Sequence, residues 1–376
     1  MKNKELLDLY TDYLISSFGL TTGTGLSALL GGSVSHDRIQ RFLAQEEFTS
    51  SDLWHIVKPH VRAIERPDGC IIIDDSISEK PYTDENDIIA WHYDHSKDRM
   101  VKGINFMSAI YHVPHVPQVP QVPQVPQLDE SHPEVSLPVA FRLVAKTEQY
   151  VDKKDGKTKR RSPISKNEHY QALLRQAKQN QVLFRFVLND VWYASAENMM
   201  FVKHELERDF IMPLKTNRKV ALSEAGKRQG QYVRVDSLAL VPGEGRIVYL
   251  EGLDFPLMLS KQIFVNEDGS RVAQYLVCSL VQLTSDQITT IYGTRWNVEE
   301  YHKSLKQNVS LEKSPTHTVC TQTNHLFASL CGYVKLELLK LSNHLNHFAL
   351  KSSIYLRALQ VAFDALRQLQ PVRLAA

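Results

Sequence analysis

The chain has 376 residues, a length that predicts two or three domains. Its hydrophobic share of 43% is enough for buried cores, but no stretch approaches the roughly 20 continuous apolar residues of a transmembrane helix. The net charge of +2 indicates nothing by itself. Because the N-terminus also lacks the pattern of a signal peptide, we expect a cytoplasmic protein with no membrane partner. The cysteines are far apart, which predicts reduced thiols: Cys70, Cys278, Cys320 and Cys331.

Residues 1–65 are predicted to be a helical region. Ser35 is a candidate N-cap, because its hydroxyl can accept a hydrogen bond from a free amide of the first turn. The following segment places Arg38 and Arg41 on a polar side and Ile39 and Phe42 on an apolar side. Two helices around a turn, the second one basic, fit a helix-turn-helix that binds DNA. An ordinary helical cap on the core is the alternative, and the pattern does not decide between them.

The sequence of the next region, residues 66–215, predicts an α/β fold. GCIIIDDS (residues 69–76) is a short β-branched run that predicts a buried strand ending in acids. VLFRFVLND (residues 182–190) is a second such run that ends in Asp190. Further strands are expected at residues 103–113 and 136–145, with helices between them. Strands that alternate with helices predict a layered α/β sheet.

Two segments of this region stand apart. VPHVPQVPQVPQVPQ (residues 113–127) has proline at every third position, so it predicts an extended polyproline rod in a surface loop. A proline-binding partner is the alternative interpretation. The second segment crowds basic residues into a predicted loop, which is either a solvated turn or a phosphate-binding patch: Lys153, Lys154, Lys157, Lys159, Arg160 and Arg161.

The rest of the chain divides into three parts. Residues 216–284 read as short antiparallel strands, and Asn266-Glu267-Asp268-Gly269 predicts a hairpin turn, so we expect a β-rich insertion. Residues 285–345 begin with a strongly helical segment, IYGTRWNVEEYHKSLKQN. Residues 346–376 are expected to form a C-terminal helical region.

Acidic residues on these elements predict a metal site. Asp74, Asp75 and Asp190 follow strand-like runs, where catalytic groups of α/β sheets usually lie. Neighbouring carboxylates repel each other unless a cation or a proton lies between them, and Mg²⁺ prefers oxygen ligands. The alternative for each aspartate is that its side chain caps a turn.

A helix supplies a third carboxylate. Steps of three, four and seven residues place four side chains on one helical stripe: Tyr292, Arg295, Glu299 and Lys306. Glu300 would point about 100° away, which favours Glu299. An exposed, salt-bridged helix face is the alternative. His95 could approach such a site, or it could be an ordinary surface histidine.

These residues resemble the DDE transposases of bacterial insertion sequences, specifically the insertion-sequence-four superfamily. The helix signature of that family is Tyr, two residues, Arg, three residues, Glu, six residues, Lys, and the stripe fits it without a gap. IIIDDSISEK and VLNDVWYASAENM are similar to the two aspartate blocks. On that match Asp75, which precedes Ser76, is the metal ligand, and Asp74 is the second choice. The resemblance implies an RNase H-like catalytic core with a β-rich insertion and an N-terminal helical DNA-binding domain.

The resemblance also implies a function. Asp75, Asp190 and Glu299 would hold two Mg²⁺ ions, with Mn²⁺ as a substitute, and catalyse cleavage and strand transfer on double-stranded DNA. The enzyme would act at terminal inverted repeats, join them to target DNA as a homodimer, and be associated with the nucleoid. Arg295 and Lys306 would steady phosphates, and Tyr292 would donate a hydrogen bond to one. Two rivals are a nuclease that cuts without joining and an inactive or domesticated transposase that only binds DNA.

Overall fold

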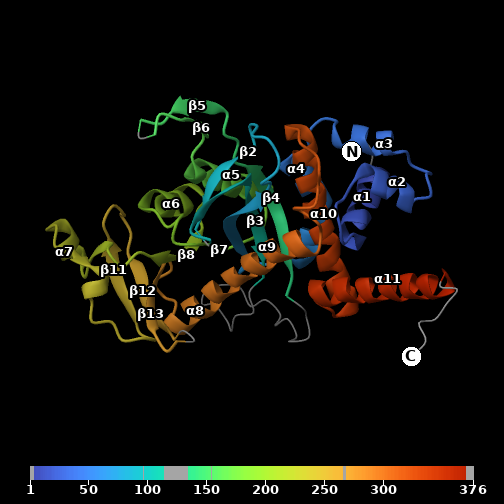
Figure 1. Cartoon of the computed structure of the whole chain (residues 1–376). Coiled ribbons are helices and arrows are strands. Elements are labelled where there is room, and N and C mark those ends of the chain that lie inside the picture. The colour runs from blue at the N-terminus through green and yellow to red at the C-terminus, as the bar shows by residue number, and fades with distance from the viewer. Residues whose placement is uncertain (1–3, 96, 114–133, 154, 266–267, 370–376) are drawn as a thin grey trace. The chain divides into compact units, whose positions relative to one another are not determined.

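The computed structural model describes residues 4–95, 97–113, 134–153, 155–265 and 268–369. All but the first residue of the predicted proline repeat at 113–127 falls outside these ranges, as do Lys154 of the basic segment and residues 266–267 of the predicted hairpin turn. The chain forms two compact units: Thr49–Glu300, and Met1–Phe48 together with Tyr301–Ala376 (Figure 1).

The Thr49–Glu300 unit is built on one large mixed sheet. In the described part of this unit the strand order is β10-β9-β11-β12-β13-β8-β7-β1-β3-β2, with β4 also paired to β3. The strands are β1 (Cys70–Glu79), β2 (Ile89–Asp94), β3 (Arg99–His112), β4 (Ser136–Leu143), β7 (Phe186–Asn189), β8 (Asp209–Leu214), β9 (Lys219–Ala221), β10 (Val233–Arg234), β11 (Gly245–Leu250), β12 (Leu257–Val265) and β13 (Arg271–Cys278). This mixed α/β architecture fits the predicted RNase H-like core.

The centre of the sheet is parallel. β1 pairs with β7 and β7 pairs with β8 in parallel register, whereas β1 and β3 are antiparallel. Ile71, Ile72 and Ile73 are fully buried, as expected for a strand covered on both faces. The helices of this unit are α4 (Ser50–Ile64), α5 (Lys166–Gln179), α6 (Ala196–Met200) with a π-helical turn (Phe201–Glu205), α7 (Glu224–Arg228) and α8 (Ser285–Gly293).

The two acids of β1 do not lie at a strand tip, so that prediction was wrong. β1 continues to Glu79, and its pairing with β3 runs through Asp74 and Asp75 without a break. The pairing with β7 does end here, at Ile73 and Asn189. Asp74 and Asp75 are therefore the first residues of β1 that β7 no longer covers.

The predicted β-rich region extends the central sheet. Its strands β9 to β13 were expected as an insertion, and β12 and β13 do form the predicted antiparallel hairpin. β13 then pairs with β8, with Tyr275 opposite Leu214. Because this backbone ladder is continuous, the region continues the same sheet.

The basic segment is part of a hairpin: Lys159, Arg160 and Arg161 lie on a strand where a loop was predicted, whereas Lys153 and Lys157 lie in the turn between two strands. β5 (Glu148–Val151) and β6 (Thr158–Arg161) pair in antiparallel register. Three of the basic side chains in this hairpin form ion pairs: Lys159 with Asp152 and Asp155, Arg160 with Asp87, and Arg161 with Glu148. These charges are thus partly neutralised by the protein itself, which weakens the case for a phosphate-binding patch.

The second unit is helical. It contains α1 (Lys4–Ser16), α2 (Gly23–Leu29), α3 (His36–Leu43), α10 (Val319–Asn343) and α11 (His347–Leu369). Its core includes the hydroxyl of Tyr10 hydrogen-bonded to Nδ1 of His325 at 2.9 Å, and Phe48 stacked on Phe327. α4, which belongs to the predicted region 1–65, packs on β4 within the Thr49–Glu300 unit.

Several local predictions in this unit are confirmed. Ser35 is the N-cap of α3, and its side chain accepts a hydrogen bond from the amide of Arg38. Ile39 and Phe42 are buried, whereas Arg38 and Arg41 are exposed.

All four cysteines of the chain are free thiols. A separate observation concerns membranes: within the described ranges, none of the helices combines the length and the apolar character of a membrane-spanning segment.

A substitution at Gly103 tests how closely β3 packs against β1. This glycine lies opposite Glu79, and a Cβ at this position would collide with the carbonyl oxygen of Ser78 and lie 2.9 Å from Cγ2 of Ile77. We expect Gly103→Ala to lower the free energy of unfolding by about 2 kcal/mol, because backbone atoms cannot move aside cheaply. Gly293→Ala is the matched control, since nothing lies within 4 Å of its Cβ position. Urea unfolding of both variants measures the difference, and equal stabilities would contradict the packing.

Candidate metal centre

The segment that carries the predicted stripe is helical with one interruption. α8 ends at Gly293, a 3₁₀ turn spans Thr294–Trp296, and α9 spans Asn297–Gln307. Thr284 begins α8 with a capping box, in which its hydroxyl accepts from the amide of Gln287 while the Gln287 side chain accepts in return. The stripe is therefore divided among three short elements, with Tyr292, Arg295 and Glu299 on one each.

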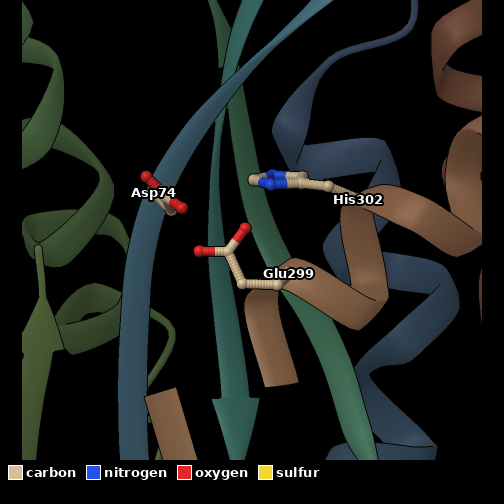
Figure 2. A group of neighbouring side chains, drawn as sticks. All are labelled: Asp74, Glu299 and His302. Carbon is tan, nitrogen blue, oxygen red and sulfur yellow. The ribbon is translucent and has the colours of Figure 1, made fainter. Parts of the chain in front are cut away.

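β1 and α9 bring two carboxyl groups together. A carboxylate oxygen of Asp74 and one of Glu299 lie within 4.8 Å of each other. Figure 2 shows the two carboxyl groups turned toward each other from the strand and from the helix. The sequence predicted Glu299 and Asp75, with Asp74 as the second choice, and the structure brings Glu299 together with Asp74.

Asp190 lies near Asp74, whose pKa its charge helps to raise, although the group of close ligand atoms consists of Asp74, Glu299 and His302. Asp190 is one residue beyond the pair formed by Ile73 and Asn189, so the parallel register, continued by one residue, carries it beside Asp74. One of its carboxylate oxygens accepts hydrogen bonds from the amides of Trp192 and Tyr193, at 3.0 and 3.4 Å. These two bonds fold the chain into a tight turn and fix the direction of the Asp190 side chain.

The acids lie close enough to one another to oppose each other's ionisation. Burial, together with the charges of Asp190, Asp75 and Glu299, raises the pKa of Asp74 well above its ordinary value. Burial also raises the pKa of Asp190, with a contribution from Asp75, although the two amides and Arg295 oppose it. Such shifts arise when carboxylates share a site with too little positive charge, which is the condition that a bound cation relieves.

Asp75 faces a different set of partners. Its Oδ2 accepts hydrogen bonds from Nζ of Lys166 and from Nδ2 of Asn105, both at 2.7 Å, and its Oδ1 accepts one from the hydroxyl of Tyr193. Burial opposes ionisation, but Lys166 and these hydrogen bonds lower the pKa of Asp75 below its ordinary value. Consecutive strand residues point to opposite faces, so Asp75 and Asp74 lie on different faces of β1. Asp74 accepts a hydrogen bond from the amide of Asp75 at 2.9 Å.

The remaining residues of the stripe lie close to the acids or along α9. The guanidinium of Arg295 forms an ion pair with Glu299 at 3.4 Å and lies over the ring of Tyr292. The hydroxyl of Tyr292 donates to the carbonyl of Asn189 at 3.2 Å, so here it anchors the end of β7. Lys306 lies two turns beyond Glu299 on α9, and its Nζ is 3.7 Å from Glu312.

His302 is a residue that sequence reasoning did not select. It follows Glu299 by three residues on α9, so both side chains leave the helix on the same side, and Figure 2 draws it with the two acids. An imidazole nitrogen is a common metal ligand. The signal that could have found it is the spacing itself, because Glu-x-x-His on a helix is a known metal-binding pattern.

Two known protein families match parts of the chain. Residues 2–232 match the family described as DDE superfamily endonuclease. The chain belongs to this DDE superfamily. Residues 164–335 also match the transposase DDE domain. Membership makes the protein a nuclease-type enzyme whose substrate is DNA. None of the curated proteins compared with it matches its sequence.

The ion pair between Lys166 and Asp75 predicts a pH-dependent contribution to the stability of this DDE protein. The pKa of Asp75 is lowered in the folded state, so the pair stabilises the fold above the ordinary aspartate pKa of about 3.9 and loses this effect as the pH falls through the folded pKa. We expect Lys166→Met to cost about 2 kcal/mol at pH 7, less than for a fully buried pair because the Lys166 side chain is 33% exposed. The difference from wild type should shrink below about pH 4.

Unfolding at several pH values measures this effect. Lys178→Met is the matched control on the same helix, because its pair with Glu207 is longer and more exposed, and it should change stability by under about 0.5 kcal/mol. Equal losses in the two variants, or a loss in Lys166→Met that does not depend on pH, would show that Asp75 does not rely on Lys166.

Proposed function

We propose that the protein is a transposase that cuts DNA at the ends of a mobile element and joins the freed ends to target DNA, with Asp74, Asp190 and Glu299 as its cation ligands. The observation that carries this proposal is the approach of a carboxylate oxygen of Asp74 to within 4.8 Å of one of Glu299, and the raised pKa of Asp74, due to burial and to the charge of Asp190, supports it. The predicted ligand Asp75 is replaced by Asp74, because the oxygens of Asp75 already accept hydrogen bonds from Lys166, Asn105 and Tyr193.

The donor set fits divalent cations. Three carboxylates from two strands and a helix provide the oxygen ligands that Mg²⁺ and Mn²⁺ accept, and His302 adds a nitrogen that Mn²⁺ tolerates better than Mg²⁺. When bound, two such ions would lower the pKa of an attacking water and stabilise the leaving 3′ oxygen. The ligands need no covalent intermediate on the protein.

The surrounding side chains would orient the acids and the DNA. Arg295 holds Glu299 by its ion pair and would be released toward a phosphate when a cation takes over the carboxylate. Tyr292 ties α8 to the backbone just before Asp190, and Tyr193 donates its hydroxyl to Asp75 and its amide to Asp190. These two tyrosines would therefore keep β1, β7 and the helix in register during the reaction.

The spacing of the stripe supports a proposal for the superfamily and for the type of reaction. Tyr292, Arg295, Glu299 and Lys306 support membership of the insertion-sequence-four superfamily and a cut-and-paste reaction. Joining two element ends to one target requires two active copies, so we propose a homodimer on DNA. Arg38 and Arg41, both exposed on α3, would bind the terminal repeats, and Lys306 would contact the phosphate backbone.

Cleavage of a labelled duplex carrying the element's ends, in Mg²⁺, tests the proposal. Asp74→Asn and Glu299→Gln should lower the cleavage rate about 100- to 1,000-fold, since each removes a charge that stabilises the reaction. Glu300→Gln, one residue further on α9, is the matched control and should cleave like wild type. Joined products in wild type would separate a transposase from a nuclease that only cuts.

Asp75→Asn separates the two aspartates. It should retain Mg²⁺-dependent cleavage at a reduced rate, because it keeps a hydrogen-bonding side chain toward Asn105 and Tyr193. If Asp75→Asn abolished cleavage while Asp74→Asn preserved it, the assignment of Asp74 would be wrong. End binding without cleavage by any form would indicate an inactive copy that only binds DNA.

A further inference from the structure

The turn that precedes α9 rests on the face of the sheet that carries Asp74. Cys70 and His112 lie opposite each other in the β1–β3 ladder. Because side chains alternate between the two faces of a strand, Cys70 shares a face of β1 with Asp74, and His112 lies beside Cys70 on that face. The 3₁₀ turn before α9 begins at Thr294, whose side chain forms a hydrogen bond with the thiol of Cys70. The sheet therefore supports the backbone close to the point where the helix begins.

His112 is the centre of a buried chain of hydrogen bonds. The residue is fully buried, and its Nδ1 lies 3.0 Å from Oγ of Ser136, which is opposite it in the β3–β4 ladder. Its Nε2 lies 3.4 Å from Nδ2 of Asn297, the first residue of α9. The same Nδ2 donates to the carbonyl oxygen of Thr294 at 3.0 Å. The chain links β4, β3 and the start of α9 within the Thr49–Glu300 unit.

These contacts determine which nitrogen of the His112 ring carries the proton. A carbonyl oxygen can only accept, so the Asn297 atom that faces Thr294 is the amide nitrogen, which can only donate. The same amide nitrogen faces Nε2 of His112, so Nε2 must offer a lone pair. The ring is therefore neutral with its proton on Nδ1, which donates to Ser136. Every hydrogen bond of the chain then has one direction, from Asn297 through His112 to Ser136.

Asn297 fixes how α9 begins. Its amide joins the helix to the preceding turn through Thr294 and to β3 through His112. Glu299 follows two residues later, in the first turn of the helix. The side chain of Glu299 is 45% exposed, and its ion pair is with Arg295, which lies in the same 3₁₀ turn. Because packing holds such an exposed side chain only weakly, the direction of the Glu299 carboxylate depends on how the backbone of α9 is anchored.

We propose that His112 is a positioning residue that fixes, through Asn297, the direction in which α9 presents Glu299 to the cation. The proposal rests on the proposed function, in which Glu299 is a cation ligand. His112 acts without touching the cation or the DNA, since its two ring nitrogens face Asn297 and Ser136. Residues that hold a metal ligand from behind change metal affinity or activity by about 10- to 100-fold when they are replaced.

Two substitutions separate the two hydrogen bonds of His112. Glutamine can place its side-chain oxygen near the position of Nε2, so His112→Gln keeps an acceptor for Asn297 and loses the donor to Ser136. Asparagine can place its amide nitrogen near the position of Nδ1, so His112→Asn keeps the donor to Ser136 and leaves Asn297 without this acceptor. Both substitutions remove the ring, so the free energy of unfolding should fall by similar amounts in the two variants.

Mg²⁺-dependent cleavage at saturating duplex DNA, measured per folded protein, distinguishes positioning from a structural role. His112→Asn should lower kcat about 10-fold and leave the KM for DNA unchanged, whereas His112→Gln should recover most of the wild-type rate. The Mn²⁺ affinity of the protein without DNA should follow the same order. Equal cleavage rates in the two variants would overturn the proposal, because a structural role would affect both alike.

Tyr111→Phe is the matched control on β3. Tyr111 is the neighbour of His112 and is also fully buried, and its hydroxyl accepts a hydrogen bond from the amide of Arg66 at 2.7 Å. The variant should be less stable than wild type, because that amide loses its partner, and it should cleave at the wild-type rate. A loss of kcat in Tyr111→Phe as large as that in His112→Asn would also overturn the proposal.

The tautomer of His112 provides a test that needs neither cation nor DNA. Nitrogen NMR of isotope-labelled histidines, with the His112 signals identified by their absence in His112→Gln, should show a neutral ring protonated at Nδ1. A proton on Nε2 at neutral pH would overturn the proposal, because Asn297 could not then donate to that atom. If the proton is on Nδ1 but wild type neither binds Mn²⁺ nor cleaves DNA, the proposed function has failed, and the positioning role is overturned with it.

Discussion

The parallel pairing of β1 with β7 is the constraint on which the site depends. The ladder ends at Ile73 and Asn189, so the next residue of each strand is an aspartate with no further strand pairing between them. Two acids are thereby fixed side by side on a rigid sheet, and α9 adds Glu299 from a separate element. The fully buried isoleucines before Asp74 provide the apolar free energy that holds this arrangement against the repulsion of its own charges.

The carboxyl groups on the two faces of β1 differ in how easily they ionise. Asp75 ionises easily on its face, because Lys166 and two hydrogen-bonding side chains stabilise the charge. Asp74 resists ionisation on the other face, where burial and its acidic neighbours act together. Burial also raises the pKa of Asp190, and Arg295 opposes that shift. A nuclease of the DDE superfamily gains from this division, because a charge that the fold leaves uncompensated is a charge that a cation can satisfy.

Sequence alone could predict those parts of the site that depend on local spacing. The N-cap at Ser35 and the strand-like runs before the acids are local patterns, and the structure contains them. The segment from Tyr292 to Lys306 is helical as predicted, but a 3₁₀ turn at Thr294–Trp296 divides it. The choice between Asp74 and Asp75 depends on contacts with segments that are distant in the sequence. Either residue can follow the same apolar run, and the decision depends on which face of β1 meets Lys166 of α5 and which meets Glu299 of α9. The continuation of β1 to Glu79, the sheet pairing of β13 with β8 and the ion pairs of the basic hairpin also depend on contacts between distant segments.

The most direct test of the account is the location of Mn²⁺ in crystals of the protein grown with that ion, determined by anomalous diffraction. The account predicts anomalous peaks within ligand distance of carboxylate oxygens of Asp74, Asp190 and Glu299, with the Lys166–Asp75 ion pair intact. A peak on Asp75 with Lys166 displaced, or no peak at the acids at millimolar Mn²⁺, would contradict it.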